Sequence, residues 1–222
     1  AAAKSRPLVT GHQRSRDYDG PFRYLVIDYV GPMNPTSNNG NRYMFTCACA
    51  WSGWYWAVPR EKNDAETAAT CLFYRVICDL AGYPACLGSD RDRAFTEGVV
   101  KHLVNFFGIH HVIGTAYHPQ SQSAVERPHR EYNTLCRTFM GEFRDWDVLV
   151  YIFVWTIRTT CKLFNGQYTS YEIITGMKPR SPIEPLLAQP AGLTRVSVDK
   201  YVTDLVGYLK KVHEYVDMQH RS

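Results

Sequence analysis

The chain has 222 residues, of which 45% are hydrophobic and 21% are charged, and its formal net charge is +4. This composition excludes a wholly disordered chain, and the charge is too small to indicate a nucleic-acid partner by itself. The sequence contains no run of eighteen apolar residues and no signal peptide, so we expect an intracellular protein with no membrane partner.

The seven cysteines lie within apolar runs and include no Cys-x-x-Cys pair. We therefore expect free, buried thiols and no structural zinc site made from this chain alone.

Three regions are expected. Residues 1–21 are polar and contain glycine and proline, which is typical of an amino-terminal arm or linker. Its basic side chains could contact phosphates or could belong to a solvated tail. Residues 22–185 form the core, and residues 186–222 form a linker and a carboxyl-terminal helix.

The first predicted strand contains an unexpected acid. Residues 23–30 are almost all apolar, which is typical of a central strand covered on both faces. Asp28 interrupts this run, and a buried carboxylate is costly unless it binds a partner. Asp28 therefore indicates a functional site; the alternative is a carboxylate that caps the turn before Gly31.

The following segments predict the rest of a sheet. A turn at residues 36–40 leads to strands at 42–50 and 54–59, and Asp64 is expected to cap a helix that ends near Leu80. Thr96 is expected to cap a second helix, between short strands at 85–88 and 109–114. The predicted fold is α/β, with a mixed five-stranded sheet flanked by helices and a carboxyl-terminal helical extension.

Asp90 follows the strand at 85–88, at the sheet edge where open α/β sheets place their sites. Glu126 follows a polar loop at 115–122, and its spacing from Ser123 is that of a capping box that opens a helix. Pro128 is expected to bend this helix or delay its start. Arg127, Arg130 and Arg137 lie roughly on one helical face, and Arg130 could face either phosphate or solvent.

Downstream, the apolar stretch at 146–164 is expected to pack on the core and on another subunit. A short helix at 168–176 and a proline-punctuated linker follow. Ser197 is expected to cap an amphipathic final helix that has no place in the sheet and could form an arm or a partner surface.

Three acids on three separate elements, Asp28, Asp90 and Glu126, indicate a metal site. Two Mg²⁺ or Mn²⁺ ions prefer such oxygen ligands and leave positions for substrate phosphate. We expect Asp28 to bridge the two ions, with Asp90 on one and Glu126 on the other. Such a pair of ions suits an in-line phosphodiester displacement.

The segments that contain these acids carry a family resemblance. They resemble the catalytic core of retroviral-type integrases, with the gypsy-type LTR-retrotransposon branch as the most similar group. The matching segments are 25–32 (LVIDYVGP), 40–43 (GNRY), 89–96 (SDRDRAFT), 115–120 (TAYHPQ), 125–127 (VER) and 169–180 (TSYEIITGMKPR).

The resemblance implies a ribonuclease-H-like fold with Asp28, Asp90 and Glu126 as the catalytic, metal-binding triad. It implies 3′-end processing of element DNA and strand transfer into target DNA, by a dimer or larger homo-oligomer that acts in the nucleus. The positions that it implies for DNA binding are Arg93, Tyr117, Gln120, Gln122, Arg127 and Arg130.

The chain also departs from the family pattern. Ala50 and Trp51 stand where an Asp-Arg pair is common, Ser123 replaces a usual glycine, and Pro128 is unusual after Glu-Arg. Two alternatives therefore stay open: a domesticated, non-catalytic descendant that binds DNA or protein, and a simple metal-dependent nuclease of the same fold.

Overall fold

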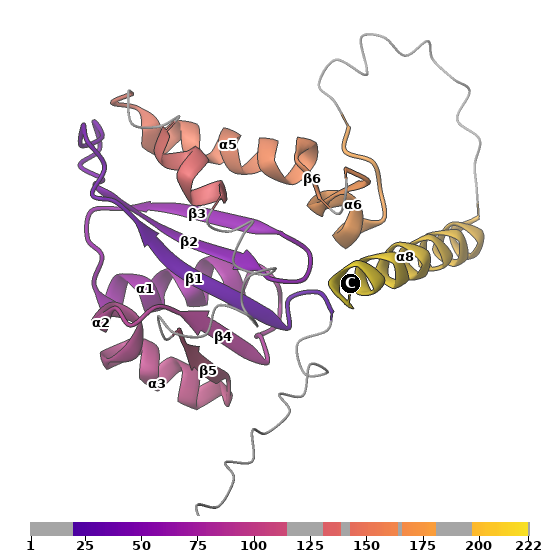
Figure 1. Cartoon of the computed structure of the whole chain (residues 1–222), viewed down its shortest axis with the longest axis horizontal. Coiled ribbons are helices and arrows are strands. Elements are labelled where there is room, and N and C mark those ends of the chain that lie inside the picture. The colour runs from indigo at the N-terminus through magenta and orange to yellow at the C-terminus, as the bar shows by residue number, and fades with distance from the viewer. Residues whose placement is uncertain (1–19, 115–130, 139–142, 164–165, 181–196, 222) are drawn as a thin grey trace, which may run out of the picture.

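The computed structural model describes residues 20–114, 131–138, 143–163, 166–180 and 197–221. Its centre is one five-stranded sheet with the order β3-β2-β1-β4-β5 (Figure 1). The strands are β1 (Tyr24–Val30), β2 (Tyr43–Cys49), β3 (Tyr55–Arg60), β4 (Cys86–Ser89) and β5 (His110–Ile113). β1 to β3 are antiparallel neighbours, whereas β4 runs parallel to both β1 and β5. The mixed five-stranded sheet predicted from the sequence is confirmed.

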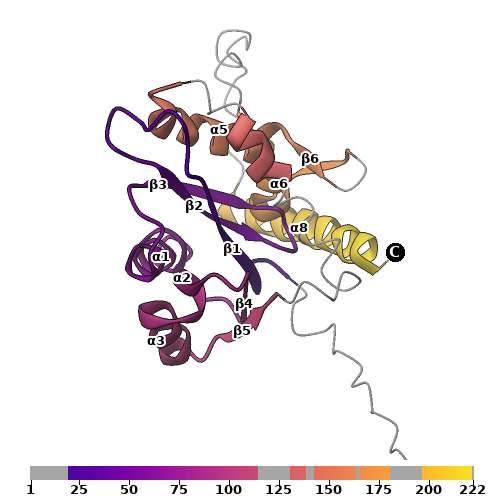
Figure 2. The ribbon, with the colours of Figure 1, turned by 60° about the vertical axis from the view of Figure 1, so that its left-hand side comes forward.

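One face of the sheet is covered by the helices that lie between β3 and β5. They are α1 (Ala65–Leu72), the π-helix η2 (Phe73–Ile77), α2 (Arg93–Thr96) and α3 (Gly98–Phe107). Alternate residues of β1, including Leu25 and Ile27, point to this face and pack with Leu72, Val76 and Val100. Figures 1 and 2 show α1 and α3 together on this side of β1.

The opposite face carries residues 131–138, which are helical, and α5 (Trp146–Thr160). Val30 and Tyr55 of the sheet pack there with Tyr132, Cys136 and Val150 in a second apolar core. β1 is therefore covered on both faces, as its apolar run predicted, whereas the edge strand β5 stays partly exposed. Beyond α5, β6 (Lys162–Leu163) and β7 (Tyr168–Thr169) form a two-stranded sheet.

The last helix attaches to the core around Trp51. α6 (Ser170–Thr175) packs against α8 (Val198–Arg221), and Figure 1 shows α8 beside α6 and outside the sheet. The Trp51 indole N–H donates to Asp217 Oδ1 at 2.7 Å, and the Trp51 carbonyl lies 2.9 Å from His220 Nε2. The ring of His213 lies edge-on to the same indole at 5.0 Å. Trp51, which departs from the family pattern, thus holds the carboxyl-terminal half of α8 against the core through these contacts.

Two of the four predicted caps are confirmed, one is wrong, and Ser123 lies outside the described residues. Asp64 caps α1 by accepting a hydrogen bond from the Thr67 amide, and Ser197 accepts one from the Lys200 amide. Thr96 caps no helix. It is the last residue of α2, and its hydroxyl donates to the carbonyl of Asp92, which itself caps α2. Helical structure therefore begins at Arg93, four residues earlier than predicted, because Asp92 supplies the capping carboxylate.

All seven cysteines are free, as predicted, but not all are buried. Cys78 is exposed because it follows the π-helix at the surface, and Cys161 is half-buried. None of the helices in the described ranges has both the length and the apolar character needed to cross a membrane.

Candidate active site

The fold brings two of the three predicted acids to the same edge of the sheet. In the parallel pair of β1 and β4, Val26 lies opposite Gly88. Asp28 and Asp90 each come two residues later on their strands, so they lie at the same level at the carboxyl ends. Asp28 is half-buried within β1, whereas Asp90 is exposed just past β4.

The Asp28 carboxylate is held on both of its oxygens. Oδ1 accepts a hydrogen bond of 2.8 Å from the Tyr29 amide, and Oδ2 accepts one of 2.9 Å from the Asn133 side-chain amide. The Tyr55 hydroxyl donates in turn to Asn133 Oδ1 at 2.7 Å. This chain of hydrogen bonds joins β3, the helical residues 131–138 and β1 at the second apolar core.

These neutral donors do not offset the cost of burying the charge. Burial raises the pKa of Asp28 from 3.8 to about 6, and the negative charge of Asp90 adds to the rise. The Tyr29 amide, Asn133 and the positive charge of Arg137 act in the opposite direction but do not cancel it. Asp28 therefore lies where a bound cation would remove an existing electrostatic penalty.

The segment around Asp90 is fixed by short hydrogen bonds. Asp90 Oδ1 accepts from the Asp92 amide at 2.9 Å, and the Ser89 hydroxyl donates to the Asp90 carbonyl at 2.9 Å. His111 Nε2 lies 2.8 Å from the same hydroxyl. Burial and the neighbouring His110 lower the pKa of His111, so this ring is neutral at pH 7. His111 thus fastens β5 to the end of β4, in agreement with its interpretation as a strand residue.

The described carboxylates fit a hard divalent cation. Asp28 and Asp90 offer carboxylate oxygens from adjacent strands, which are the ligand type that Mg²⁺ and Mn²⁺ prefer. No third His, Cys, Asp or Glu joins them within the described ranges. The predicted third acid, Glu126, lies outside the described residues.

The predicted DNA contacts are only partly described. Arg93 is exposed at the start of α2, three residues after Asp90. Arg137 is also exposed, and its charge acts on Asp28. The other predicted contacts lie outside the described residues, namely Tyr117, Gln120, Gln122, Arg127 and Arg130.

Asn133 and Tyr55 are site residues that the sequence reasoning missed. Asn133 follows Glu126 by seven residues, which is two turns at helical spacing and would place both on one face. That spacing was a usable signal for Asn133. The sequence contains no comparable signal for Tyr55, because an aromatic residue in a buried strand is usually part of the apolar core.

A second buried carboxylate lies at the start of α5. Asp147 is 4% exposed, and its Oδ2 accepts hydrogen bonds from Ser37 Oγ, Asn39 Nδ2 and Asn41 Nδ2 at 2.8, 3.0 and 2.8 Å. Burial acts to raise the pKa of Asp147, but the three donors outweigh it and the pKa is lowered. Asp147 thereby anchors the loop between β1 and β2 to α5.

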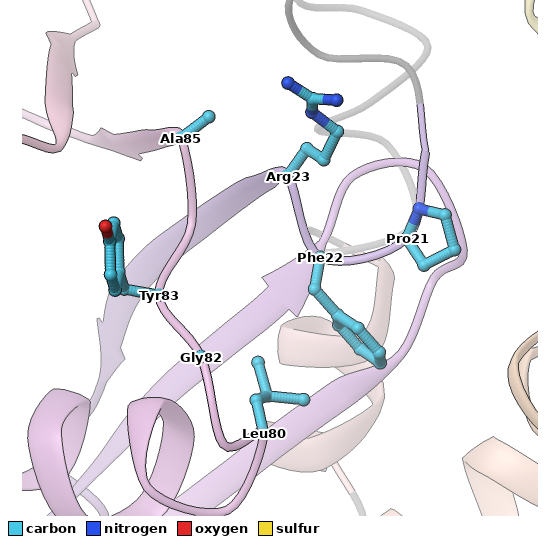
Figure 3. A pocket seen from close by; sticks show the side chains of 7 residues that line it. All are labelled: Pro21, Phe22, Arg23, Leu80, Gly82, Tyr83 and Ala85. Atoms are coloured by element: carbon cyan, nitrogen blue, oxygen red, sulfur yellow. The ribbon is translucent and has the colours of Figure 1, made fainter.

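A hollow of about 310 Å³ lies at the other end of β1, beside residues 21–23 (Figure 3). Leu80, Gly82, Tyr83 and Ala85 complete its lining. It contains no acid, and Asp28 lies near the opposite end of the strand. This hollow is therefore separate from the candidate metal site.

The sequence is similar to parts of known Pol polyproteins, although no family model matches it. It is 29% identical over 162 residues to the retrovirus-related Pol polyprotein from transposon 412 of Drosophila melanogaster, covering 72% of this chain and 13% of that protein. It is 31% identical over 163 residues to the Gag-Pol polyprotein of woolly monkey sarcoma virus, covering 72% of this chain and 9% of that protein. The chain thus spans about a tenth of the length of these relatives.

The fold is similar to solved integrase cores. The catalytic core domain of BIV integrase matches with a TM-score of 0.53 and 22% identity, over 68% of this chain and 93% of that one. The HTLV-2 integrase catalytic core domain in complex with magnesium, in a trimeric form, matches with a TM-score of 0.53 and 13% identity, over 68% and 95%. A chain of the simian T-cell lymphotropic virus intasome matches with a TM-score of 0.56 and 20% identity, over 81% and 62%.

The structural matches confirm the ribonuclease-H-like fold implied by the sequence motifs. The match to transposon 412 agrees with the gypsy-type branch. By its similarity to retroviral and retrotransposon Pol polyproteins and by its fold, the chain belongs to the retroviral-type integrase catalytic cores.

Proposed function

We propose that the chain is the catalytic core of a DNA integrase that processes the 3′ ends of element DNA and joins them to target DNA. The observation that carries the proposal is the pairing of Asp28 and Asp90 at the carboxyl ends of β1 and β4. A half-buried carboxylate whose pKa is raised beside a second carboxylate is a common arrangement at catalytic sites.

Asp28, Asp90 and Glu126 would hold two Mg²⁺ or Mn²⁺ ions in this proposal. When bound, the ions would activate the attacking hydroxyl and stabilise the charge on the leaving oxygen. The protein's own part is orientation. The Tyr29 amide and Asn133 fix the plane of the Asp28 carboxylate, and the Asp92 amide fixes Asp90. Each carboxylate keeps further lone pairs for a cation.

The reaction class is a transfer of phosphodiester bonds. In strand transfer, the 3′-hydroxyl oxygen of the element DNA attacks a target phosphorus, and the bond from that phosphorus to the target 3′-oxygen breaks. Bond making and bond breaking balance, so no covalent bond to the protein is required. Arg93, Arg127 and Arg130 would contact DNA phosphates, and Tyr117, Gln120 and Gln122 would lie against the element end.

We also propose that the core works as a homo-oligomer, because α5 presents an uncovered apolar face. Tyr151, Ile152 and Trp155 are 54%, 60% and 47% exposed on this helix. Tyr151 and Trp155 line a hollow of about 350 Å³ together with Trp54, Arg158 and residues of β3, η2 and α6. A second copy of the chain would cover this face, and Ile152→Glu should then lower the mass measured by light scattering.

The decisive test is a strand-transfer assay with processed element-end DNA and Mg²⁺, using this chain and any longer mature protein that contains it. Wild type should give joined product, and Glu126→Gln should give none. Equal product from both would exclude the triad assignment. DNA binding without joined product, in the mature protein as well, would favour the domesticated, non-catalytic alternative, and cleavage without joining would favour a simple nuclease.

A further inference from the structure

The carboxylate of Asp28 contacts a side chain that the proposed triad does not include. Asn133 donates to Asp28 Oδ2 from residues 131–138, 105 residues away in the sequence. The contact is half-buried, and it adds a polar link to the apolar packing between residues 131–138 and the strand that carries Asp28. A neutral amide at this place can hold a carboxylate without removing its charge.

The orientation of the Asn133 amide is set by Tyr55. An asparagine side chain has an acceptor oxygen and a donor nitrogen, and only the nitrogen can favourably face a carboxylate. The Tyr55 hydroxyl donates to Asn133 Oδ1 at 2.7 Å, which turns the amide nitrogen toward Asp28. Tyr55 itself is fully buried at 0% exposure and packs edge-on against Tyr132 at 5.4 Å, so its hydroxyl has little freedom to move.

The two donors leave part of the carboxylate available. An ionised carboxylate has about four lone-pair sites on its two oxygens. The Tyr29 amide uses one site on Oδ1, and Asn133 uses one site on Oδ2. The remaining sites can bind a cation while both hydrogen bonds persist.

We propose that Asn133, oriented by Tyr55, is a positioning residue that fixes the Asp28 carboxylate for metal binding. This inference rests on the proposed function, because it assigns Asn133 a role at the same metal site. Residues that orient a metal ligand from outside the ligand shell typically change metal affinity by about 10- to 100-fold when they are replaced.

The test compares metal affinity among wild type, Asn133→Leu and Tyr55→Phe. Mn²⁺ affinity is measured by titration calorimetry without DNA, and the half-saturating Mn²⁺ concentration is measured for strand transfer. We expect Asn133→Leu to weaken both by about tenfold or more. Joining at saturating Mn²⁺ should recover toward the wild-type rate, which a misfolded or merely destabilised variant would not show.

Tyr132→Phe is the matched control. Like Tyr55→Phe, this change removes one phenolic oxygen from the second apolar core. Tyr132 packs beside Tyr55 and precedes Asn133 by one residue, and its substitution leaves the contact between Asn133 and Asp28 in place. Its Mn²⁺ affinity should equal that of wild type. Tyr55→Phe should weaken Mn²⁺ binding, and this effect should disappear in the Asn133→Leu background, because Tyr55 acts through Asn133.

The outcomes separate this inference from the proposed function. Wild-type Mn²⁺ affinity in both folded Asn133→Leu and Tyr55→Phe would overturn the positioning role and leave the integrase proposal intact. An equal loss in Tyr132→Phe and Tyr55→Phe would overturn it as well, since the effect would then belong to packing. Either an absence of Mn²⁺ binding in wild type or Mn²⁺ binding that Asp28→Asn leaves unchanged would overturn the proposed metal site and this inference together.

Discussion

Two aspartates in this protein receive hydrogen bonds from distant parts of the chain, yet their pKa values move in opposite directions. Asp147 at the start of α5 receives three donors on one oxygen, and its pKa is lowered although burial opposes the change. Asp28 in β1 receives two donors on two oxygens, and its pKa rises to about 6. Hydrogen bonding alone therefore does not decide the state of a buried carboxylate.

The difference lies in what surrounds each group. The donors to Asp147 come from the polar loop at residues 37–41. Asp147 itself lies in the first turn of α5, where the helix dipole favours negative charge. Asp28 lies in an apolar strand with Asp90 as a negatively charged neighbour. At Asp147 the three donors to Oδ2 keep the pKa low without a ligand, although Oδ1 is buried and has no hydrogen-bond partner among the described residues. At Asp28 the pKa stays raised, and added positive charge would lower it. That contrast separates a structural acid from the acid that we propose binds metal.

The largest expected effect separates the two acids by activity. Asp28→Asn should lower metal-dependent strand transfer by about 1,000-fold, because loss of metal stabilisation costs several kcal/mol in the transition state. Asp147→Asn should keep the wild-type rate of strand transfer when the rate is expressed per folded molecule. The measurement is the rate of joined-product formation at saturating Mg²⁺. A similar loss in both variants would erase the distinction between the two sites.

The second prediction concerns stability. Asp147→Ala should lower the free energy of unfolding by about 2–4 kcal/mol, because it leaves buried donors without their charged acceptor. Asp145→Ala is the control, since Asp145 is an exposed acid of the same turn whose side chain accepts a hydrogen bond from Asn38. Urea denaturation with EDTA at pH 7 measures both variants. Equal losses in the two variants would contradict the assignment of Asp147 as the anchor.

The third prediction uses pH, with Asp28→Asn as the reference protein. Because the folded pKa of Asp28 is about 6 and the ordinary value is 3.8, the folded state binds the proton more tightly than the unfolded state. The stability that wild type gains from protonated Asp28 is therefore present below pH 4 and is lost as pH rises through 6. The difference corresponds to at most about 3 kcal/mol. Urea titrations with EDTA from pH 3.5 to 7.5 measure it.

Asp147 should show the opposite sign in the same experiment. Its folded pKa lies below 3.8, so its contribution is present above that value and is lost as pH falls. Wild type should therefore lose stability relative to Asp147→Asn on acidification. Parallel pH profiles for the two aspartate variants would refute the comparison.

The smallest predicted effect is stabilisation by the metal. At a Mg²⁺ concentration ten times the dissociation constant, wild type should gain about 1.4 kcal/mol in the free energy of unfolding. Asp147→Asn should gain the same amount, and Asp28→Asn should gain less. Scanning calorimetry with Mg²⁺ or with EDTA measures the change. An equal gain in all three proteins would place the ion elsewhere.

The sequence predicted the fold well because its signals were local. The apolar run around Asp28 predicted a strand buried on both faces, and Asp64 and Ser197 marked helix starts correctly. Thr96 was misassigned because two residues with capping side chains compete within five positions, and propensity does not choose between them. The π-helix η2 has no comparable signal in the sequence.

The site was less predictable, because its supporting contacts are not local. Asp28 and Asp90 followed from strand patterns and from family motifs. The spacing of Asn133 from Glu126 indicates only a shared helical face. Its contacts with Asp28 and Tyr55 depend on how residues 131–138 lie across the sheet, and no periodicity specifies that arrangement. The place of α8 was also open, and the departure at Trp51 acquired a reason only from its contacts with Asp217 and His220.

The contact between Asn133 and Asp28 has a consequence for biosynthesis. The two residues are 105 positions apart, and a ribosome that adds about 5–20 residues per second needs about 5–20 seconds to pass from one to the other. During that interval β1, β2 and β3 can pair as neighbours in the chain, with the apolar surface around Val30 and Met44 not yet covered by the helices that follow. The nascent chain is thus most exposed to aggregation, and to chaperone binding, before the residue that positions Asp28 has been synthesised.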